Sequence, residues 1–226
     1  MLLRSTLLAV ALTALAAAPA HAADPVLNPI KACYVAASED QREPVAIVGW
    51  NFTAFAPAEV LVDSTLQTTT EADFDGKLEG TVAAPYIDED QRQFTVRVSE
   101  TNAPERAATV TALVTRLLVE QSPERASTKQ KVRFRGRGFT DLSRSVYAHY
   151  VFAGRSRKTV RIGRPTGPCG LFSIRRKQFP FKQSPRIGVW TIQFDQEPKY
   201  DPKATVRVPL TIRVSKQVKR PQARAR

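Results

Sequence analysis

The segment Val45-Ala-Ile-Val-Gly49-Trp-Asn-Phe52-Thr53 recurs later in the chain as Val132-Arg-Phe-Arg-Gly136-Arg-Gly-Phe139-Thr140, and both follow the pattern V-x-apolar-x-G-x-x-F-T. Three further matches follow in the same order: Asp75–Leu78 with Cys169–Phe172, Phe94–Val98 with Trp190–Phe194, and Ala108–Val110 with Ala204–Val206. Four matches in one order predict two copies of a single domain of roughly 95 residues, a usual domain size.

Short runs of β-branched and aromatic residues, in which apolar and polar side chains alternate, occur in both copies. Such alternation predicts half-buried strands. The predicted strands are Val45–Val48, Val60–Val62, Phe94–Val98, Val110–Val114, Lys131–Arg135, Val146–Phe152, Thr159–Ile162, Val189–Phe194 and Val206–Val214. About seven short strands per copy, with turns every 8–12 residues, predict an all-β fold in which each copy is a two-sheet sandwich.

The repeat sets the expected domain boundaries. We predict one acidic sandwich over 24–118, one basic sandwich over 119–215 and a basic, disordered tail over 216–226. The sequence Gln121-Ser122-Pro123 at the start of the second copy predicts a short hinge between the two sandwiches.

The first 22 residues have the layout of a secretory signal peptide. Arg4 precedes an apolar run from Leu7 to Ala18, and Ala20-His-Ala22 places small residues at a cleavage site. A transmembrane helix needs roughly 20 apolar residues, so this run is too short to be one, and no later segment is expected to span a membrane. We therefore expect an exported protein, either secreted and extracellular or held in the cell envelope.

The repeated glycine and phenylalanine positions resemble those of the tandem immunoglobulin-like domains, of IPT/TIG type, in secreted bacterial proteins. The resemblance implies that Gly49 and Gly136 permit a tight turn, and that Phe52 and Phe139 fill the core of each sandwich. It also implies two tandem immunoglobulin-like β-sandwich domains that serve binding, spacing or surface display. It provides no catalytic residues.

The charge of the chain is divided between the copies. Residues 24–115 contain six Lys and Arg against fifteen Asp and Glu, a net charge of −9, whereas residues 116–226 contain 27 against six, a net charge of +21. Because salt screens charge over about 8 Å, a partner that touches one domain scarcely senses the other. The division suggests binding to a polyanion or head-to-tail self-association.

The basic copy contains cations at alternate positions around a predicted strand. Residues two apart on a strand share a face, so five cations, Lys129, Lys131, Arg133, Arg135 and Arg137, are predicted to line one solvent-exposed side. Other candidate polyanion-binding residues are Arg155, Arg157 and the triplet Arg175-Arg176-Lys177, with the tail from Lys216 adding further charge. The alternative is a solvated face that only keeps an exported protein soluble.

The two cysteines, Cys33 and Cys169, lie in different copies. In an oxidising compartment they are a candidate disulfide; the alternative is two free, buried thiols. Together with His149, the only histidine after the predicted cleavage site, they do not form a spaced ligand set, so no metal site and no cofactor is expected. The segment Asp73-Phe-Asp75-Gly76 resembles the start of a calcium loop, but Ala84 stands at the twelfth position, and a hairpin turn explains it better.

No motif for catalysis stands out. The chain lacks a G-x-S-x-G nucleophile segment and the glycine patterns that hold phosphates or dinucleotides. We therefore expect a non-catalytic exported binding or spacer protein whose basic domain associates with an anionic cell-wall polymer or another polyanion, nucleic acid included. The alternatives are a surface protein that self-assembles head to tail in a salt-dependent way and an extracellular carbohydrate hydrolase, which needs only two carboxylates.

Overall fold

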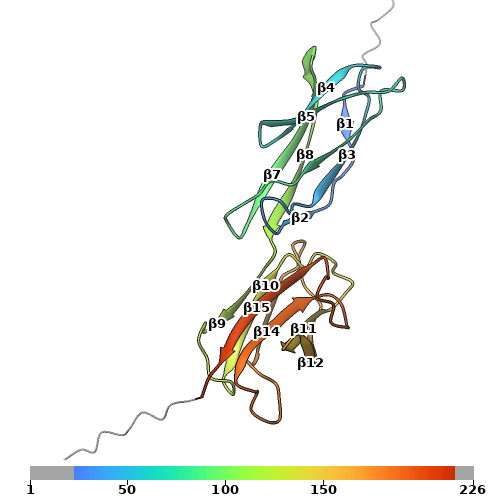
Figure 1. Ribbon diagram of the computed structural model, residues 1–226. Helices are drawn as coiled ribbons and strands as arrows, with labels where there is room; N and C mark the ends of the chain where they lie inside the picture. Colours follow the sequence, from blue (N-terminus) through green and yellow to red (C-terminus); the bar gives the residue numbers. More distant parts are fainter. Residues whose placement is uncertain (1–22, 217–226) are drawn as a thin grey trace, which may run out of the picture.

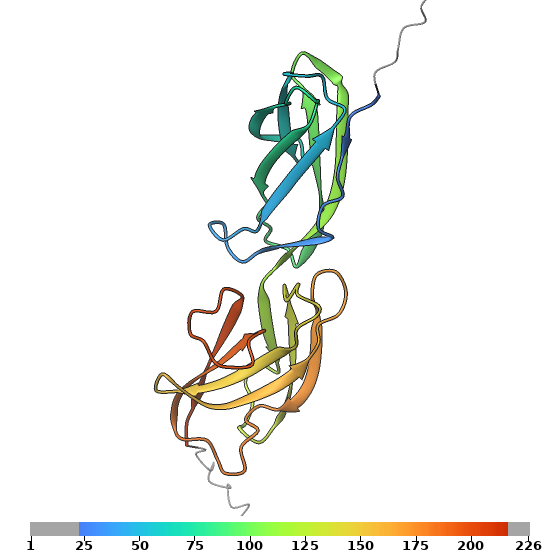
Figure 2. The same cartoon turned by 90° about the vertical axis from the view of Figure 1, so that its right-hand side faces the viewer.

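The computed structural model describes residues 23–216, and this part of the chain is all-β, with no helix (Figure 1). It therefore contains no helix long and apolar enough to cross a membrane. The predicted signal peptide over 1–22 lies outside the described residues, as does the predicted tail beyond Lys216. The strands form two β-sandwiches that follow each other along the chain (Figure 2).

The first sandwich has a three-stranded and a five-stranded sheet. The smaller sheet has the order β1-β3-β6, with β1 at Val26–Leu27, β3 at Pro44–Trp50 and β6 at Leu78–Ala83. The larger sheet has the order β2-β8-β7-β4-β5, with β2 at Cys33–Ala36, β8 at Ala103–Arg116, β7 at Gln91–Glu100, β4 at Pro57–Val62 and β5 at Thr65–Glu71. All pairs are antiparallel except β2, which runs parallel to β8.

The second sandwich repeats this arrangement with one strand fewer. Its smaller sheet has the order β13-β10-β9, with β13 at Phe172–Lys177, β10 at Lys131–Arg137 and β9 at Leu118–Ser122. Its larger sheet has the order β12-β11-β14-β15, with β12 at Arg155–Gly163, β11 at Val146–Phe152, β14 at Gly188–Asp195 and β15 at Arg207–Val214. No strand in the described chain corresponds to β2 along the edge of β15.

Each sandwich encloses its own hydrophobic cluster, built from the inward side of the alternating strands. Val45 and Ile47 belong to the first cluster, and Val132 and Phe134 to the second. All nine predicted strands are confirmed, and the structure adds six: β1, β2, β5, β6, β9 and β13. These six were missed because they are short, or because their apolar positions are interrupted by polar residues.

The repeated phenylalanines fill the cores, as the resemblance implied: Phe52 and Phe139 are both buried. The role expected for Gly49 and Gly136 is wrong. Both lie within strands, where a Cβ atom would meet the ring of Phe52 or Phe172 at 2.7 Å and 2.1 Å, respectively. These glycines therefore make room for an aromatic ring and do not form a turn.

The turn glycines are instead Gly76 and Gly170, which occupy equivalent positions in the two copies. The carbonyl oxygen of Gly76 accepts a hydrogen bond from the backbone N–H of Phe52 at 3.1 Å, and that of Gly170 from Phe139 at 3.3 Å. Both glycines have positive φ, +72° and +60°. The sequence repeat is therefore also a repeat in three dimensions.

The chain passes from one sandwich to the next without a flexible segment at the expected place. Strand β8 ends at Arg116 and β9 begins at Leu118, and Gln121 and Ser122 are paired with β10. The predicted hinge at Gln121–Pro123 is wrong, because the start of the second copy is needed as an edge strand of its smaller sheet.

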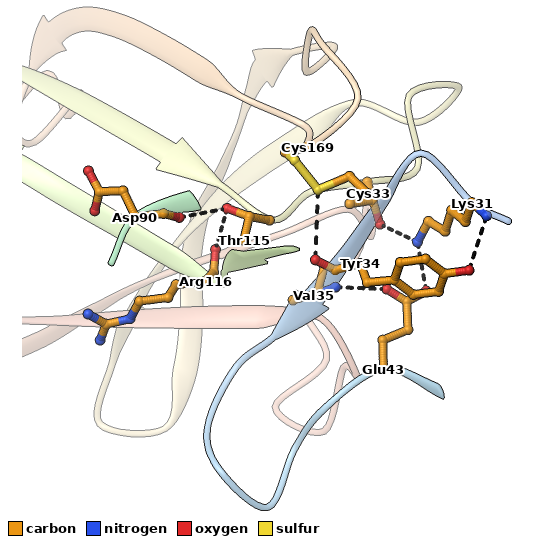
Figure 3. The surroundings of a disulfide bond; sticks show 10 residues. Lys31, Cys33, Tyr34, Val35, Glu43, Asp90, Thr115, Arg116 and Cys169 are labelled. Carbon is orange, nitrogen blue, oxygen red and sulfur yellow. Dashed lines mark hydrogen bonds and ion pairs between the residues drawn. A yellow bond between two sulfur atoms is a disulfide. The ribbon is translucent and has the colours of Figure 1, made fainter. Parts of the chain in front are cut away.

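Three contacts join the sandwiches where they meet, and Figure 3 shows the surroundings of the first of them, the disulfide. Cys33 and Cys169 form a disulfide whose Cα atoms are 5.2 Å apart. A guanidinium nitrogen of Arg137 lies 2.5 Å from a carboxylate oxygen of Asp90. The ammonium group of Lys31 donates a hydrogen bond to the hydroxyl of Thr140 at 3.1 Å.

Candidate functional site

Strand β10 presents cations on the outer face of the smaller sheet of the second sandwich. Lys131, Arg133 and Arg135 are exposed, while Val132 and Phe134 between them are completely buried. The alternation fixes this orientation, because turning the strand over would bury three charges and expose two core residues.

The neighbouring strand β13 adds two more cations to the same face. In the antiparallel register, Lys177 lies directly opposite Lys131, and Arg175 directly opposite Arg133. Both side chains are exposed. We call the set Lys131, Arg133, Arg135, Arg175 and Lys177 the cationic face. Residues two apart on one strand are about 6.6–7 Å apart, and neighbouring strands are about 4.7–4.9 Å apart, so these cations start from closely spaced backbone positions.

The cationic face borders two hollows. The larger, of about 520 Å³, lies between β9 and β15 and is lined by Arg133 and Arg135 together with Leu210 and Ile212. The smaller, of about 250 Å³, is lined by Lys131, Arg133, Arg135 and Arg175. The face is therefore uneven, and the two arginines of β10 belong to both hollows.

Within the described residues, no side chain of the cationic face forms an ion pair or a side-chain hydrogen bond. Like charges placed directly opposite each other on adjacent strands destabilise a sheet. The two like-charged pairs thus weaken the fold slightly, whereas Arg135 lies opposite the exposed Glu120 of β9 without forming an ion pair with it among the described residues. The five positive charges remain available to an external anion.

The other predicted cations do not join this face. Lys129 is exposed but lies in the turn before β10, so the row on the strand is shorter than the five residues expected. Arg137 is half-buried and is paired with Asp90 of the first sandwich, with Glu120 at 3.9 Å. Arg137 therefore helps to join the two copies and is not free to bind a polymer.

Arg176 faces the opposite way from its neighbours Arg175 and Lys177. It is paired with Val132, on the inner side, where its Nε atom is buried without a hydrogen-bond partner among the described residues. The hydroxyl of buried Tyr150 also lacks such a partner. Burial raises the pKa of Tyr150 to about 12, and the charge of Arg176 opposes this shift.

Arg155 and Arg157 are exposed on β12, which belongs to the other sheet. The register between β11 and β12 is shifted between Tyr150 and Val151, and Arg157 is the residue left without an opposite partner there. These two arginines contribute to the basic surface but not to the cationic face.

The sequence did not predict that Arg175 and Lys177 pair with β10. The one signal for a strand there is that Phe172 and Ile174 alternate with polar residues.

Two groups of side chains could in principle support catalytic chemistry. Glu120 and Glu124 both line the larger hollow, but both are exposed on the same rim, which does not give them the two different environments that an acid and a nucleophile require. His149 Nε2 lies 3.0 Å from Asp195 Oδ1, and both residues are completely buried. His149 Nδ1 contacts the hydroxyl of Thr159 at 2.9 Å.

The His149–Asp195 pair holds a long connection in place. Asp195 Oδ1 also accepts a hydrogen bond from the backbone N–H of Glu197 at 2.9 Å, and Tyr200 packs against the imidazole ring. These contacts hold the segment between β14 and β15 in place, so the His149–Asp195 pair has a structural role. Trp190 of β14 is buried in the core of the second sandwich. Within residues 23–216 no group of three or more His, Cys, Asp or Glu side chains is placed to hold a metal ion.

The turn at Asp73–Gly76 serves the fold. Asp73 Oδ1 accepts hydrogen bonds from the backbone N–H groups of Asp75 and Lys77, each at 2.9 Å. The turn joins β5 to β6, which belong to different sheets, so the expected hairpin is wrong. The carboxylate of Asp73 is engaged by the backbone of its own turn.

No family model matches the chain, and no curated protein matches it. Among solved structures it is similar to a protein from Corynebacterium diphtheriae described as membrane anchored, with 10% identity, a TM-score of 0.32 and coverage of 76% of this chain and 54% of that one. It is also similar to a 1.5-MDa bacterial ice-binding adhesin, with 12% identity, a TM-score of 0.28 and coverage of 76% of this chain and 57% of that one. A third similar structure is the central fibronectin-III array of RIM-binding protein, with 10% identity, a TM-score of 0.26 and coverage of 84% of this chain and 71% of that one. The chain thus spans little more than half the length of the first two.

Proposed function

We propose that this protein is a non-catalytic, exported binding protein whose second sandwich holds a linear polyanion on the cationic face. The observation that carries the proposal is the register of β10 and β13, which places Lys131 opposite Lys177 and Arg133 opposite Arg175. A face that only needed to be soluble would gain more from alternating charges, because opposite charges across strands stabilise a sheet.

The proposed ligand is an anionic polymer of the cell envelope that carries phosphate or uronate groups. Five cations over two adjacent strands match a chain with repeated charges better than a single small anion. Single-stranded nucleic acid is disfavoured, since proteins that bind it stack its bases on exposed aromatic rings. In the described second sandwich, the exposed large hydrophobic residues are Leu142, Leu171, Ile187 and Val189, and none is aromatic.

The test is the salt dependence of binding to polyphosphate and to polygalacturonate. Binding of a polyanion releases counterions, so the logarithm of the affinity falls linearly with the logarithm of the salt concentration, by about 0.7–0.9 per contact. The triple variant Arg133→Gln, Arg135→Gln, Arg175→Gln removes three contacts, and we expect its slope to be smaller by roughly 2 to 3.

A matched control removes the same amount of charge elsewhere. Arg155, Arg157 and Arg164 are exposed and lie outside the cationic face, so replacing all three by Gln should leave the slope within about 0.5 of the original. Equal losses in both triple variants would mean that the whole basic surface binds without a defined site. Preference for single-stranded DNA over both polymers would assign the face to nucleic acid.

A further inference from the structure

The end of the first sandwich that lies away from the second carries exposed aromatic side chains. Two turns form this end, residues 51–56 before β4 and residues 72–77 before β6, and we call them the distal tip. The register places it: Ala58, at the start of β4, pairs with Glu100 at the end of β7, and β8 runs from there to Arg116 beside the second sandwich (Figure 2).

Phe74 and Phe55 are the most exposed large hydrophobic residues of the described chain, at 71% and 65%. A hydrogen bond from the backbone N–H of Phe55 to the carbonyl oxygen of Asp73, at 3.4 Å, holds the two turns together. Phe55 also has φ of +58°, a conformation that is unfavourable for a bulky residue. Neither aromatic ring therefore serves the core of this sandwich.

A buried ionic network fixes the shape of the distal tip. Glu100 is 4% exposed and accepts hydrogen bonds from the backbone N–H of Thr53 at 2.7 Å, from its hydroxyl at 2.9 Å and from Arg106 at 3.0 Å. Arg106 also donates to the carbonyl oxygen of Asn51 at 2.6 Å. A rigid tip loses little conformational entropy when it binds a partner.

The same turns of the second copy are an interface within this molecule. Thr140 corresponds to Thr53, and Cys169 to Asp75; the first contacts Lys31 and the second is bonded to Cys33. Arg137, which corresponds to Trp50, pairs with Asp90 in the connection between β6 and β7. In this repeat, the tip of the second copy packs on the opposite end of the first copy, and we call that opposite end of each copy its base.

The base of the second copy has the chemistry to receive such a tip. The connection that corresponds to the one containing Asp90 is residues 178–187, between β13 and β14. It presents exposed Lys182, Arg186 and Ile187, beside the turn that contains Lys129, because the backbone N–H of Gln178 donates to the carbonyl oxygen of Gln130 at 2.9 Å. The distal tip instead exposes Asp75 beside its aromatic rings.

We infer that the protein assembles head to tail, with the distal tip of one molecule docked on the base of the second sandwich of another. The tip carries two aromatic rings and the exposed carboxylates of Asp73 and Asp75, while its one cation, Lys77, is already paired with Glu79. It therefore complements the basic, partly apolar base, and the contact repeats the geometry of the internal junction with the charges reversed. The successive sandwiches of a filament would then be joined alternately by the disulfide-linked junction and by this contact. The inference can be tested separately from polymer binding, because Arg133, Arg135 and Arg175 lie within their strands, whereas only Lys131 and Lys177 of the cationic face border the base.

Two variants test the inference by sedimentation velocity at low salt, without any added polymer. The tip variant combines Phe55→Asn, chosen because Asn tolerates positive φ, with Phe74→Ser. The base variant combines Lys182→Glu with Arg186→Glu. We expect the original protein to form concentration-dependent species larger than dimers, and each variant alone to associate at least tenfold more weakly. A mixture of the two should form a one-to-one complex and nothing larger, since one intact tip meets one intact base.

The controls separate this contact from other causes. Leu66→Ser alters an exposed apolar residue on β5, away from the tip, and should assemble like the original. The triple variant of the cationic face should also assemble normally, so loss of polymer binding and loss of assembly are distinguishable. An original protein that stays monomeric at low salt, or a folded tip variant that assembles unchanged, would overturn the inference. Unchanged melting temperatures verify that both variants are folded, and either one suffices for the test.

Discussion

Arg133 and Arg175 lie directly opposite each other on β10 and β13, and both side chains are exposed with no ion-pair partner in the described chain. Lys131 and Lys177 repeat the arrangement two residues further along each strand, on the same face. Such pairs act against the sheet that carries them, so binding and stability are expected to pull in opposite directions at these positions.

Replacing Lys177 with Glu should make the protein more stable and a weaker binder. The change turns a repulsive cross-strand pair with Lys131 into an attractive one, worth about 0.2–1 kcal/mol of unfolding free energy at low salt. Urea unfolding measures the gain and titration with polyphosphate the loss of affinity. A variant that gains stability and keeps full affinity would show that Lys177 does not contact the polymer.

Gly76 and Gly170 should each resist replacement by alanine. A Cβ atom would lie 2.2 Å from the carbonyl oxygen of Phe52 at the first position and 2.0 Å from that of Phe139 at the second. We expect either substitution to cost more than about 2 kcal/mol of unfolding free energy. Gly154 has the same φ as Gly76, +72°, but open space around it, so Gly154→Ala should cost only about 1 kcal/mol. Equal costs at the three positions would remove the steric explanation.

The distal tip should loosen in acid through Glu100. Burial by itself raises the pKa of this carboxyl, but the hydrogen bonds from Thr53 and Arg106 outweigh it and lower the pKa below its ordinary value. The stabilisation is therefore present above the unfolded pKa, near 4.3, and is lost as the pH falls through the lower folded pKa.

Unfolding in urea between pH 6 and pH 3 measures this effect, and Glu100→Gln is the comparison. The variant should be less stable at pH 6, since the amide cannot replace a carboxylate beside Arg106. The difference should shrink as the pH falls below about 4.3. A constant difference over the whole range would contradict a role for the ionised carboxylate.

The disulfide between Cys33 and Cys169 should hold the two sandwiches together. Non-reducing peptide mapping is expected to recover the two cysteines in one linked peptide. After reduction, Arg137–Asp90 and Lys31–Thr140 would remain, and polar contacts of this kind at a surface contribute about 1 kcal/mol or less each. Small-angle scattering should then show a broader distribution of shapes, with each sandwich still folded around its own core. The double variant Cys33→Ser, Cys169→Ser should behave like the reduced protein, and identical scattering from oxidised and reduced samples would contradict this role.

Much of the candidate site can be predicted from the order of residues in β10. The alternation of cations with Val132 and Phe134 predicts which side of the strand faces solvent, because a side-chain period of two is a local property of the strand. The contribution of β13 cannot be predicted in this way, since the sequence does not state which strand pairs with β10 or in which register. The ion pair of Arg137 cannot be predicted for the same reason. The sequence places Arg137 at the end of the row of cations, but its partner Asp90 lies 47 positions earlier in the chain.

The repeat, the β class and the division of charge follow from the amino-acid sequence alone, because they depend only on which residues succeed each other. Other features arise only in the folded protein. In the folded protein, Gln121 and Ser122 belong to the edge strand β9 where a hinge was expected. Gly76 and Gly170 form the turns with positive φ, whereas Gly49 and Gly136 make room for aromatic rings. The fold also brings Cys33 next to Cys169. Each of these depends on backbone segments far apart in the chain, whose pairing is set by the packing of whole sheets and not by local residue preference.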